Sequence, residues 1–585
     1  MDYQSLPTTQ KDVCIIGAGP VGLATAIMLS SPPHNYHCVV IEANVDVNNF
    51  NPGRGFMYNV NSRGRKFTQM FPGVDAKLVE MGVESDFGRL CVIPSDPNEA
   101  LPEVAHTASI TLDSDDDDKI NHKEGIDLNG KVNPAINKVI KSSQEKGGLG
   151  KKSYWIQRHD LTRLLRDYCL EENSKNSRDK VKAERGSVEI VSGSKCVNVF
   201  PSSTNDTLPS GRGGGGAEAL IENLKTGDIT KYRCNLVVGA DGYRSKVRSF
   251  LMKNDASEGS LHQSKLWEKI PSRKFLVKKF KSPATHLRLK VLQFPPKFPI
   301  PDNDNNEIKT NGEYIYAIKS KNNGPKDFIS FGILPIKDND AIRPVNVIAR
   351  PNHDLWKIND PEEVREWFQS SFPRMNFDSE NGLLSKKEWE RFVEEEGTRF
   401  PHCQFTNGVS TSSVDKQSAV VLVGDALHSY PPDIGQGVNS GLSDVVELGK
   451  ALENVDLSVE GNKKTKDISL GDAMKKFETN RLAETKALIR LARFGSPYQY
   501  SQPLYIDRIG KKLWTFNVLI RVLLNKASFG LIPQPAIMLS QDSDLSFKQV
   551  MFRADLVTFG LGTFASWLLK KIFWQRLLNT LSPLL

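Results

Sequence analysis

Apolar and polar residues follow one another in short blocks, and the first blocks predict a β-α-β unit. The apolar run Val13–Ile16 ends at Gly17, small helix-forming residues follow over Gly22–Ser30, and the apolar run Cys38–Ile41 ends at Glu42. Short apolar runs bounded by turn residues are typical of buried strands. Two such strands joined by a helix pair in parallel, so we expect a parallel sheet that begins near residue 12.

A different pattern occupies the middle of the chain. Residues 289–294, 314–318 and 328–334 are rich in β-branched and aromatic residues with polar breaks, which predicts an antiparallel sheet inserted into the first domain. Residues 361–372 predict a helix, because a proline opens the segment, glutamates follow it, and apolar residues recur at helical spacing.

Three polar stretches interrupt these patterns, and we expect each to be a solvated loop. Residues 95–150 contain an acidic run, residues 201–216 end in consecutive glycines, and residues 299–312 are rich in Asn and Asp. Such compositions cannot bury enough apolar surface to form a core.

The C-terminal part predicts helices and ends in an apolar segment. Leu556–Leu569 lacks charge and is followed by Lys570 and Lys571. The run is shorter than the roughly 20 residues that a spanning helix needs, unless the lysines extend toward the headgroups. Trp567, Trp574 and the basic residues suit a membrane boundary, which favours interfacial or anchored attachment. A helix packed on the protein's own surface is the alternative.

Composition excludes several classes of protein. The 585 residues suit two closely joined domains, and 39% hydrophobic with 25% charged residues is a globular balance. A net charge of +8 is mild, and the basic residues are interleaved with acids, so no nucleic-acid partner is expected. The 7 cysteines include no C-x-x-C pair, and the N-terminal residues are too polar for a signal peptide, so we expect reduced thiols in a cytosol-facing protein.

The turn after the first predicted strand carries the pattern G-x-G-x-x-G. Gly17 permits a tight turn, Gly19 lets the backbone approach a pyrophosphate, and Gly22 allows close packing of helix and strand. The helix N-terminus presents free N–H groups to the phosphates. Glu42, at the end of the second strand, can accept hydrogen bonds from ribose hydroxyls, which favours FAD or NAD over NADP.

A second glycine-rich region decides between these cofactors. Asp425 follows the apolar strand 421–423, where its carboxylate can bind a ribityl hydroxyl, and Gly435–Asn439 opens a helix suited to a pyrophosphate or to the carbonyl edge of an isoalloxazine. Two such turns far apart in the chain fit the long FAD molecule. His428 lies close by without a second ligand at metal-binding spacing, so we expect a structural histidine and no metal.

These segments resemble the signature of the para-hydroxybenzoate hydroxylase-like flavin monooxygenases. The resemblance rests on 424–444, on the D-G-x-x-S-x-x-R pattern in 236–248, and on 157–161. It implies that Asp241 serves FAD and NAD(P)H and that Arg158 reaches the flavin side. The expected FAD-binding residues are Gly17, Gly19, Val21, Gly22, Glu42, Ala43, Arg54, Arg158, Asp241, Asp425, Gly435, Gly437, Val438 and Asn439.

Further segments are similar to the kynurenine 3-monooxygenase family: residues 53–65, 333–335 with 364–373, and 498–500 with 531–533. The similarity implies that Arg89, Tyr498 and Gln499 contact the substrate. The chain departs from that family at several positions on the substrate side. These departures are Met57 and Gln499 in place of asparagines, Asp433 and Ile434 in place of phenylalanines, and Pro535 in place of a tyrosine.

We therefore expect an α/β fold with a Rossmann-like FAD-binding domain, an inserted antiparallel β-sheet substrate domain and C-terminal helices. The expected limits are 10–250 with 395–455, 260–394, 456–550, and a membrane-associating tail at 551–585. The resemblance implies that NAD(P)H and O2 are consumed to hydroxylate a small aromatic substrate, with L-kynurenine favoured, at a membrane such as the mitochondrial outer membrane. A hydroxylase or epoxidase of another phenolic or isoprenoid compound, and a non-catalytic flavin-fold protein, are the alternatives. No catalytic acid or base is assigned.

Overall fold

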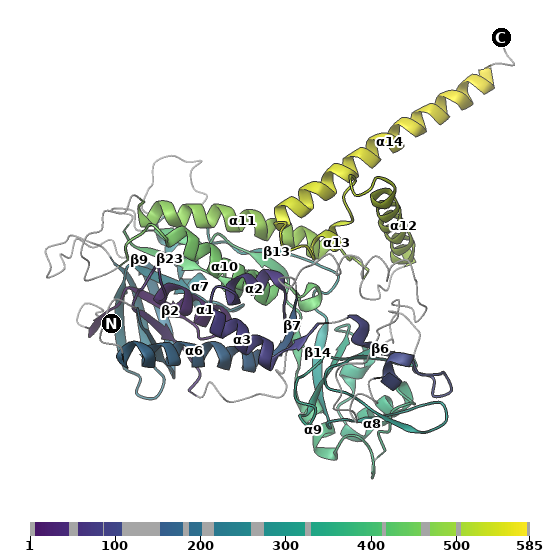
Figure 1. The fold of residues 1–585 in the computed structure, drawn as a ribbon, viewed down its shortest axis with the longest axis horizontal. Helices are drawn as coiled ribbons and strands as arrows, with labels where there is room; N and C mark the ends of the chain where they lie inside the picture. Colours follow the sequence, from purple (N-terminus) through teal and green to yellow (C-terminus); the bar gives the residue numbers. More distant parts are fainter. Residues whose placement is uncertain are drawn as a thin grey trace. The chain divides into compact units, whose positions relative to one another are not determined.

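The computed structural model describes residues 6–45, 57–85, 87–107, 152–178, 186–201, 216–258, 274–321, 329–378, 380–411, 417–457, 468–498 and 505–581. The chain divides into two compact units (Figure 1). The first comprises Met1–Phe280 and Ala284–Thr479, and the second comprises Lys281–Pro283 and Asn480–Leu585.

A six-stranded sheet forms the centre of the first unit. Its strands, in spatial order, are β22 (Val409–Thr411), β23 (Ala419–Leu422), β12 (Leu236–Gly239), β2 (Val13–Ile16), β3 (Cys38–Ile41) and β8 (Val188–Val191). All neighbours pair in parallel except β22 and β23, which are antiparallel. The parallel sheet expected from the first β-α-β unit is confirmed.

Both faces of this sheet are covered, which explains why its strands are apolar throughout. Val13 and Ile15 of β2 join the core formed with α1 (Pro20–Ser30), α6 (Arg158–Arg178) and α10 (Gly437–Leu452). Cys14 and Ile16, which point the other way, join a second core. Since side chains alternate along a strand, this division follows directly from β geometry.

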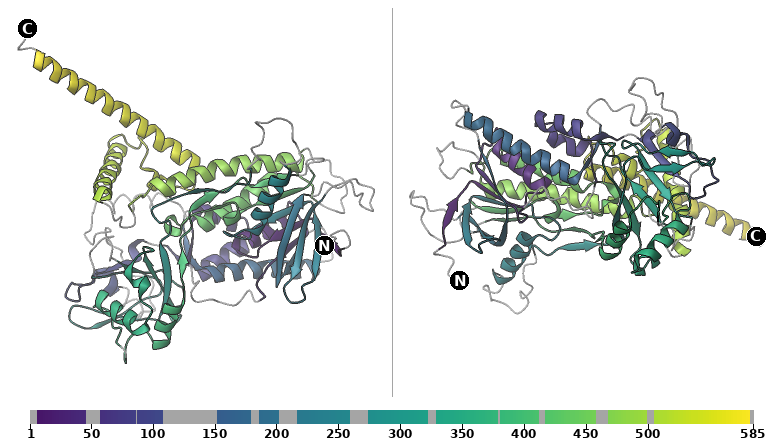
Figure 2. Two further views of the ribbon diagram at one scale, coloured as in Figure 1. Left: turned by 180° about the vertical axis from the view of Figure 1, so that it is seen from behind. Right: turned by 90° about the horizontal axis from the view of Figure 1, so that it is seen from below.

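The second core lies against a four-stranded sheet that the sequence analysis did not anticipate. Its strands, in spatial order, are β1 (Thr8–Gln10), β11 (Ile229–Cys234), β10 (Ala217–Asn223) and β9 (Ser194–Pro201). The helix α7 (Lys246–Glu258) follows β12 in the chain. Figure 2 shows the strands of the first unit from behind and from below.

The expected antiparallel sheet is also present in the first unit. Its strands, in spatial order, are β20 (Thr398–Arg399), β14 (Arg288–Phe294), β19 (Arg343–Ala349), β18 (Ser330–Ile333), β17 (Ile315–Lys319) and β6 (Leu90–Ile93). Only the β17–β6 pair is parallel. The helices α8 (Pro361–Ser371) and α9 (Lys386–Glu394) pack against the sheet through a core rich in phenylalanine. The helix expected over 361–372 is confirmed, and the Asp360 side chain caps its first turn.

Smaller elements connect these sheets. They are a sheet of β4 (Met57–Val60), β7 (Tyr154–Gln157) and β5 (Val83–Glu84), a sheet of β13 (Lys278–Phe280), β21 (Cys403–Phe405) and β24 (His428–Ser429), and the helices α2 (Ser62–Thr68) and α3 (Pro72–Met81). All 7 cysteines are buried and free, as expected for reduced thiols.

One expected loop proves to be ordered structure. Residues 299–312 contain the hairpin β15 (Pro299–Pro301) and β16 (Glu307–Lys309). The polar residues fold the turn, since the Asp302 carboxylate accepts hydrogen bonds from the backbone N–H groups of Asp304 and Asn306, each at 2.8 Å. The expectation of a solvated loop was wrong there. The expected loop segments 108–150 and 202–215 lie outside the described residues.

The second unit is helical. Helix α11 (Leu470–Phe494) enters it, and α12 (Tyr505–Ala527), α13 (Ala536–Leu539) and α14 (Phe547–Leu581) follow. Glu484 caps α14, because its carboxylate accepts hydrogen bonds from the N–H groups of Phe547 at 2.8 Å and Lys548 at 3.2 Å. Arg490 and Asp555 form an ion pair at 2.8 Å that joins α11 to α14.

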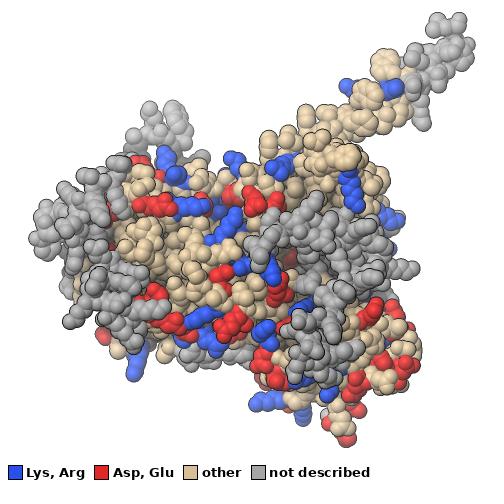
Figure 3. Space-filling view, in the orientation of Figure 1, with Lys and Arg blue, Asp and Glu red and all other residues tan. Residues whose placement is uncertain are grey.

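Helix α14 is longer than the apolar run suggested. It contains 35 residues, of which the 28 residues Phe547–Trp574 are long and apolar enough to cross a membrane by length and composition, and this segment is mostly exposed. The expectation that this segment falls short of a span is corrected, because helix formation extends beyond Leu556–Leu569 on both sides. In the space-filling view this helix is mostly neutral at its surface (Figure 3).

Candidate functional site

Three neighbouring parallel strands place the main sequence motifs at one edge of the sheet. Ile16 of β2 is in register with Gly239 of β12, which is in register with Leu422 of β23. The turns that begin at Gly17, Ala240 and Val423 therefore leave the sheet side by side. The crevice outside the carboxyl ends of strands is where open α/β sheets bind ligands.

The first turn has the geometry expected for a nucleotide-binding loop. Gly17 has φ +106°, and a Cβ there would lie 2.7 Å from the Ala240 carbonyl oxygen. A Cβ on Gly22 would lie 1.9 Å from the Gly17 oxygen, so helix and turn touch at this point. No atom lies within 4 Å of a Cβ built on Gly19, and no side chain caps the α1 N-terminus there. The turn is thus closed by Gly17 and Gly22 and left open at Gly19.

Glu42 braces this turn from the next strand. Its carboxylate accepts hydrogen bonds from the backbone N–H groups of Ala18 and Asn44, each at 2.8 Å. The side chain is half-buried and the neighbouring Ala43 is exposed. A carboxylate oxygen accepts more than one hydrogen bond, so Glu42 retains capacity for ribose hydroxyls while it fixes the loop.

Val21 connects the first turn to the second glycine-rich region. Its methyl groups would lie 3.1 Å from a Cβ on Gly424 and 2.5 Å from a Cβ on Gly441. The two glycines therefore allow the start of α1 to approach both the turn after β23 and helix α10. Val21 therefore packs the start of α1 against these two segments, a contact that the spacing of residues along the chain did not reveal.

The start of α10, like the turn at Gly19, leaves free space beside its glycines. No atom lies within 4 Å of a Cβ built on Gly435 or on Gly437, and Gln436 provides no side-chain cap. Val438 and Asn439 are buried in the first turn. The first N–H groups of α10 therefore have no capping side chain, which is the condition for binding an anion or a polarised carbonyl.

The Asn439 side chain is fully engaged by the protein. Its amide nitrogen donates to the carbonyl oxygens of Asn59 and Gly435, each at 2.8 Å, and its oxygen accepts from Asn61 N–H at 3.0 Å. Gly64 of α2 packs against it, because a Cβ there would lie 2.3 Å from the Asn439 oxygen. Asn439 thus joins α10 to β4 and α2, and only its backbone is free for a cofactor role.

Asp425 lies in the short turn Gly424–Ala426 immediately after β23. Its side chain keeps an accessible surface, yet the surrounding protein partly desolvates it and raises the pKa of the carboxyl. The charge of His428, that of Arg158 and that of Arg248 oppose this shift. A carboxylate that is accessible to a ligand but partly shielded from water is suited to accept a hydrogen bond from a ligand hydroxyl.

Arg158 and Tyr58 share the neighbourhood of Asp425. Arg158, which begins α6, is exposed and lowers the pKa of Asp425. Burial raises the pKa of the Tyr58 phenol, while Arg158 lowers it and Asp425 raises it further. The structure therefore brings these three side chains together from distant parts of the chain. Tyr58 was not identified from the sequence, where a single tyrosine in a short strand gave no signal.

Asp241 has a divided environment. Its Oδ2 accepts hydrogen bonds from the N–H groups of Lys246 at 2.6 Å and Val247 at 3.1 Å, and so caps α7. Its Oδ1 is buried and has no hydrogen-bond partner among the described residues. Burial raises the pKa of this carboxyl. The unsatisfied oxygen leaves Asp241 available to a further hydrogen-bond donor, and its cofactor role stays a prediction.

Arg248 ties the Asp241 turn to the Asp425 turn. Its guanidinium donates to the carbonyl oxygens of Tyr243 at 2.6 Å and Ala426 at 2.8 Å. The sequence analysis included Arg248 in a motif but assigned it no role, because contacts between separate turns cannot be derived from spacing alone.

His428 is a buried structural residue. Its Nε2 lies 2.8 Å from Asp444, whose carboxylate also accepts a hydrogen bond from Gly424 N–H at 2.8 Å. The expected structural role of His428 is what the geometry shows, although the sequence analysis overlooked Asp444 as its partner. Within the described residues, no group of three His, Cys, Asp or Glu side chains could hold a metal ion.

Two of the expected substrate residues are described, Arg89 in the first unit and Tyr498 in the second. Arg89 forms an ion pair with Glu313, which also pairs with Lys337 at 3.2 Å. Tyr498 lies in the second unit, where its hydroxyl packs against Gly510 of α12. Arg54 and Gln499 lie outside the described residues. The pairing of Arg89 reduces the positive charge available to a substrate carboxylate.

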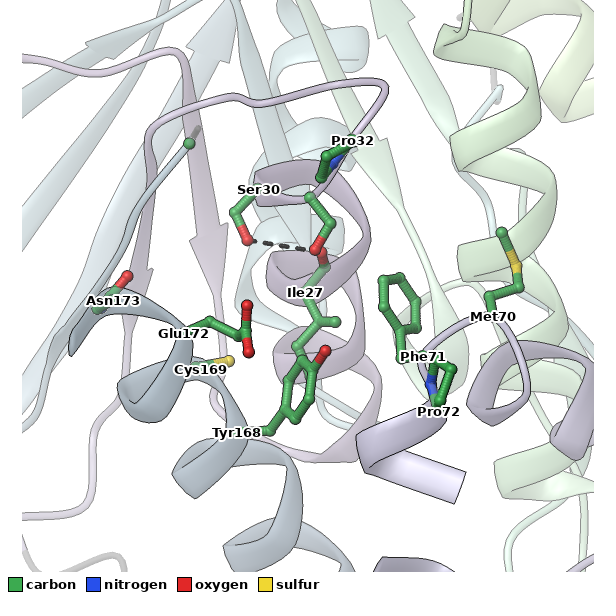
Figure 4. Close-up of a pocket in the computed structure, with 12 residues that line it drawn as sticks. Ile27, Ser30, Pro32, Met70, Phe71, Pro72, Tyr168, Cys169, Glu172 and Asn173 are labelled. Carbon is green, nitrogen blue, oxygen red and sulfur yellow. Dashed lines mark hydrogen bonds between the residues drawn. The ribbon is translucent and has the colours of Figure 1, made fainter. Parts of the chain in front are cut away.

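A separate pocket lies on α1, α6 and the turn before α3 (Figure 4). Its volume is about 270 Å³, and its lining includes Ile27, Phe71, Tyr168 and Glu172. None of the expected cofactor residues lines it. The pocket is therefore distinct from the edge of the sheet where the glycine-rich turns meet.

Comparison with known proteins supports a flavoprotein. Residues 395–462 match the family described as FAD binding domain. The kynurenine 3-monooxygenase of Dictyostelium discoideum is 36% identical over 85 residues, which cover 14% of this chain and 18% of that protein. The ubiquinone biosynthesis monooxygenase of Saccharomyces cerevisiae is 22% identical over 320 residues, 52% of this chain and 59% of that protein.

A similarity to a solved structure was also found. The anhydrotetracycline hydroxylase from Streptomyces rimosus has a TM-score of 0.48 and 14% identity, with 87% of this chain and 72% of that chain covered. The chain thus spans between 18% and 59% of the two curated relatives above. The two curated relatives are monooxygenases with different printed activities, and FAD is the cofactor that the matched family supports.

Proposed function

We propose that the chain is an FAD-dependent monooxygenase that consumes NAD(P)H and O2 to hydroxylate a small aromatic compound, with L-kynurenine as the favoured substrate and 3-hydroxykynurenine as the product. The observation that carries the proposal is the register of β2, β12 and β23, which brings the turns at Gly17, Ala240 and Val423 to one edge of the sheet. A long dinucleotide needs such a row of turns.

The residues present fit FAD. The open sides of Gly19, Gly435 and Gly437 leave room for close approach of a ligand, and the α1 and α10 N-termini offer N–H groups to phosphate or carbonyl oxygens. Glu42 and Asp425 would accept hydrogen bonds from ribose and ribityl hydroxyls. When bound, FAD takes electrons from NAD(P)H and activates O2 for insertion of one oxygen atom into the aromatic ring.

The chain's own contribution is to bind and orient. Glu42 holds the first glycine turn through Ala18 and Asn44, and Arg248 holds the Asp425 turn against the Asp241 turn. These contacts hold the cofactor-binding turns in place before a ligand binds, which lowers the entropic cost of binding. N–H groups at the start of α10 would stabilise negative charge that develops next to them.

The preference for kynurenine rests on sequence similarity. The segment shared with the kynurenine 3-monooxygenase of Dictyostelium discoideum has the highest identity among the relatives named above. Purified protein should contain FAD, oxidise NADPH faster when kynurenine is added, and release the hydroxylated product. Stimulation by other ring compounds without stimulation by kynurenine would retain the enzyme class and reject this substrate.

A second candidate is hydroxylation of a phenolic or isoprenoid compound. The similarity to the ubiquinone biosynthesis monooxygenase covers a larger share of the chain, and the chain departs from the kynurenine 3-monooxygenase pattern at Asp433, Ile434 and Gln499. Product analysis with prenylated phenols beside kynurenine separates the two candidates. Absence of NAD(P)H oxidation with every compound would instead favour a non-catalytic flavin-binding protein.

The C-terminal helix carries the proposal of a membrane location. α14 combines a span-length apolar segment with Lys570 and Lys571 near its end, and would hold a cytosol-facing enzyme to a membrane such as the mitochondrial outer membrane. Removal of residues 551–585 should move the protein to the soluble fraction while FAD stays bound, because every cofactor residue precedes residue 445. A truncated protein that stays with membranes would place the attachment elsewhere.

A further inference from the structure

Helix α12 exposes an apolar face that the fold of the second unit does not cover. Ile506, Leu513 and Phe516 are 68%, 64% and 62% exposed, and Ile509 and Leu523 are also exposed. Their spacing of three, four or seven residues places them on one arc of the helix. Contiguous exposed apolar surface of this kind marks a site of interaction.

A neighbouring side of α12 is where the helix meets its own unit. Arg521 is buried there, and its guanidinium donates hydrogen bonds to the Ala554 carbonyl oxygen at 3.3 Å and to the Thr558 hydroxyl at 2.8 Å, both on α14. The packed face of α12 is therefore occupied by α14, and the apolar arc is a separate surface.

A basic flank runs beside the apolar arc. Arg508, Lys512 and Lys526 are exposed on this flank, and Lys511 is exposed on another side of the helix. Helix α12 contains Arg508, Lys511, Lys512, Arg521 and Lys526 against the single acid Asp507. Five positive charges minus one negative give +4, half of the net +8 of the whole chain, on 23 residues. Such a charge excess attracts an anionic lipid surface.

The apolar surface continues past the end of the helix. Phe529 and Leu531 are 98% and 87% exposed in the turn that follows α12. A helix with an apolar arc, a basic flank and aromatic residues at its end has the composition of helices that lie in the plane of a membrane interface. Its attachment to α14 through Arg521 brings this surface close to the start of the segment that is long enough to span.

We propose that α12, with the turn 528–532, docks onto an anionic phospholipid surface as an in-plane interfacial helix. The inference rests on the proposed membrane location of α14 and adds a second, separate contact. The α12 arc would enter the headgroup boundary, with Arg508, Lys512 and Lys526 near lipid phosphates. Together the two contacts would fix the orientation of the second unit relative to the bilayer, which one spanning helix cannot do.

The test places a single environment-sensitive fluorophore on the full-length, FAD-loaded protein. Because all 7 native cysteines are buried, a cysteine introduced at an exposed position can be labelled selectively. Leu513→Cys reports on the arc, Lys511→Cys is the matched control about 160° away on the same helix, and Ser566→Cys reports on α14. Emission is compared in detergent, in neutral phosphatidylcholine vesicles and in vesicles that also contain phosphatidylserine.

The proposal expects the probe at position 513 to shift to shorter wavelength and to be quenched by lipid-attached quenchers, more strongly with phosphatidylserine, while the probe at 511 stays in water. A probe at 513 that stays in water while the one at 566 enters lipid overturns the inference and leaves the α14 proposal standing. A Leu513→Cys thiol already shielded from soluble reagents before lipid is added also overturns it, because a second copy or another part of the chain then covers the arc. If neither 513 nor 566 enters lipid, both proposals fail.

Discussion

The parallel sheet of the first unit and the helices of the second unit place the same kinds of apolar residue in opposite surroundings. Val13 and Ile15 of β2 have no exposed surface, because helices cover one face of the sheet and a second sheet covers the other. Leu513 of α12 and Phe559 of α14 are 64% and 74% exposed. In the sheet of the first unit the chain supplies apolar partners for these side chains, whereas it supplies none for the exposed faces of α12 and α14 in the second unit.

This difference separates two roles of apolar residues. Substitution in the sheet removes contacts inside the protein and should lower the free energy of unfolding. Substitution of an exposed apolar residue of α12 or α14 removes little internal contact, and its effect should appear in membrane binding.

Ile15→Ala should have the largest effect, with a loss of about 2–5 kcal/mol in the free energy of unfolding, because a cavity would form in a core that is closed on every side. Thermal unfolding of FAD-saturated protein provides the measurement. A loss below about 0.5 kcal/mol, the range of ordinary surface substitutions, would show that the sheet is not packed as described.

The two glycines of the first turn should respond differently. Gly22→Ala places a Cβ 1.9 Å from the Gly17 oxygen and should cost roughly 1–3 kcal/mol or more of stability. Gly19→Ala is the matched control, since no atom lies within 4 Å of the new Cβ. It should leave the melting temperature unchanged and weaken FAD binding. Equal loss of stability in both variants would contradict the open turn at Gly19.

Asp425→Ala should weaken FAD binding by roughly 1–3 kcal/mol, because a ligand hydroxyl would lose its acceptor. The exposed side chain makes no hydrogen bond that the fold depends on among those described, so unfolding should change little. Equilibrium dialysis followed by flavin absorbance measures the loss. Full flavin occupancy in the variant would assign Asp425 a purely structural role.

Asp433 should make stability depend on pH. Burial raises the pKa of its carboxyl to about 6, above the value of about 3.9 in the unfolded chain. The folded state then holds the proton more tightly, so this stabilisation is present below pH ~4 and is lost as the pH rises through ~6. The change should be on the order of 1 kcal/mol, because the side chain is only partly buried. Asp433→Asn should flatten the profile between these values, and an unchanged profile would assign the dependence to other groups.

Leu513→Ala should have the smallest effect on folding, within about 0.5 kcal/mol, because the side chain already faces outward. Compared with Ile15→Ala, it isolates the difference between the two units. Detergent-solubilised protein should unfold at the same temperature with and without the substitution. A loss comparable to that of Ile15→Ala would mean that α12 packs against protein after all.

The sequence predicted those parts of the fold that depend on local pattern. The runs Val13–Ile16 and Cys38–Ile41 form strands as expected, because each contains enough apolar residues to be buried on both faces. The four-stranded sheet β1-β11-β10-β9 was missed, since its short, mixed segments become strands only by pairing with one another. The hairpin in 299–312 was missed because its polar residues, which suggested a loop, form the hydrogen bonds that fold the turn between its strands.

The candidate site followed the same division. The glycines and Glu42 could be placed from spacing, because their roles depend on one β-α-β unit. Tyr58 and Arg248 could not, because their neighbours come from turns hundreds of positions away in the chain. The ion pair between Arg89 and Glu313 could not be predicted either, because only the folded sheet brings these two residues together.

The most direct test of the central claim is incorporation of isotopically labelled O2 by the purified full-length protein supplied with NADPH and kynurenine. The account predicts a protein with bound FAD that releases 3-hydroxykynurenine carrying one labelled oxygen atom, with NADPH oxidised in step. Protein that retains FAD but transfers no labelled oxygen to kynurenine or to any phenolic or isoprenoid compound tested would contradict the assignment as a monooxygenase.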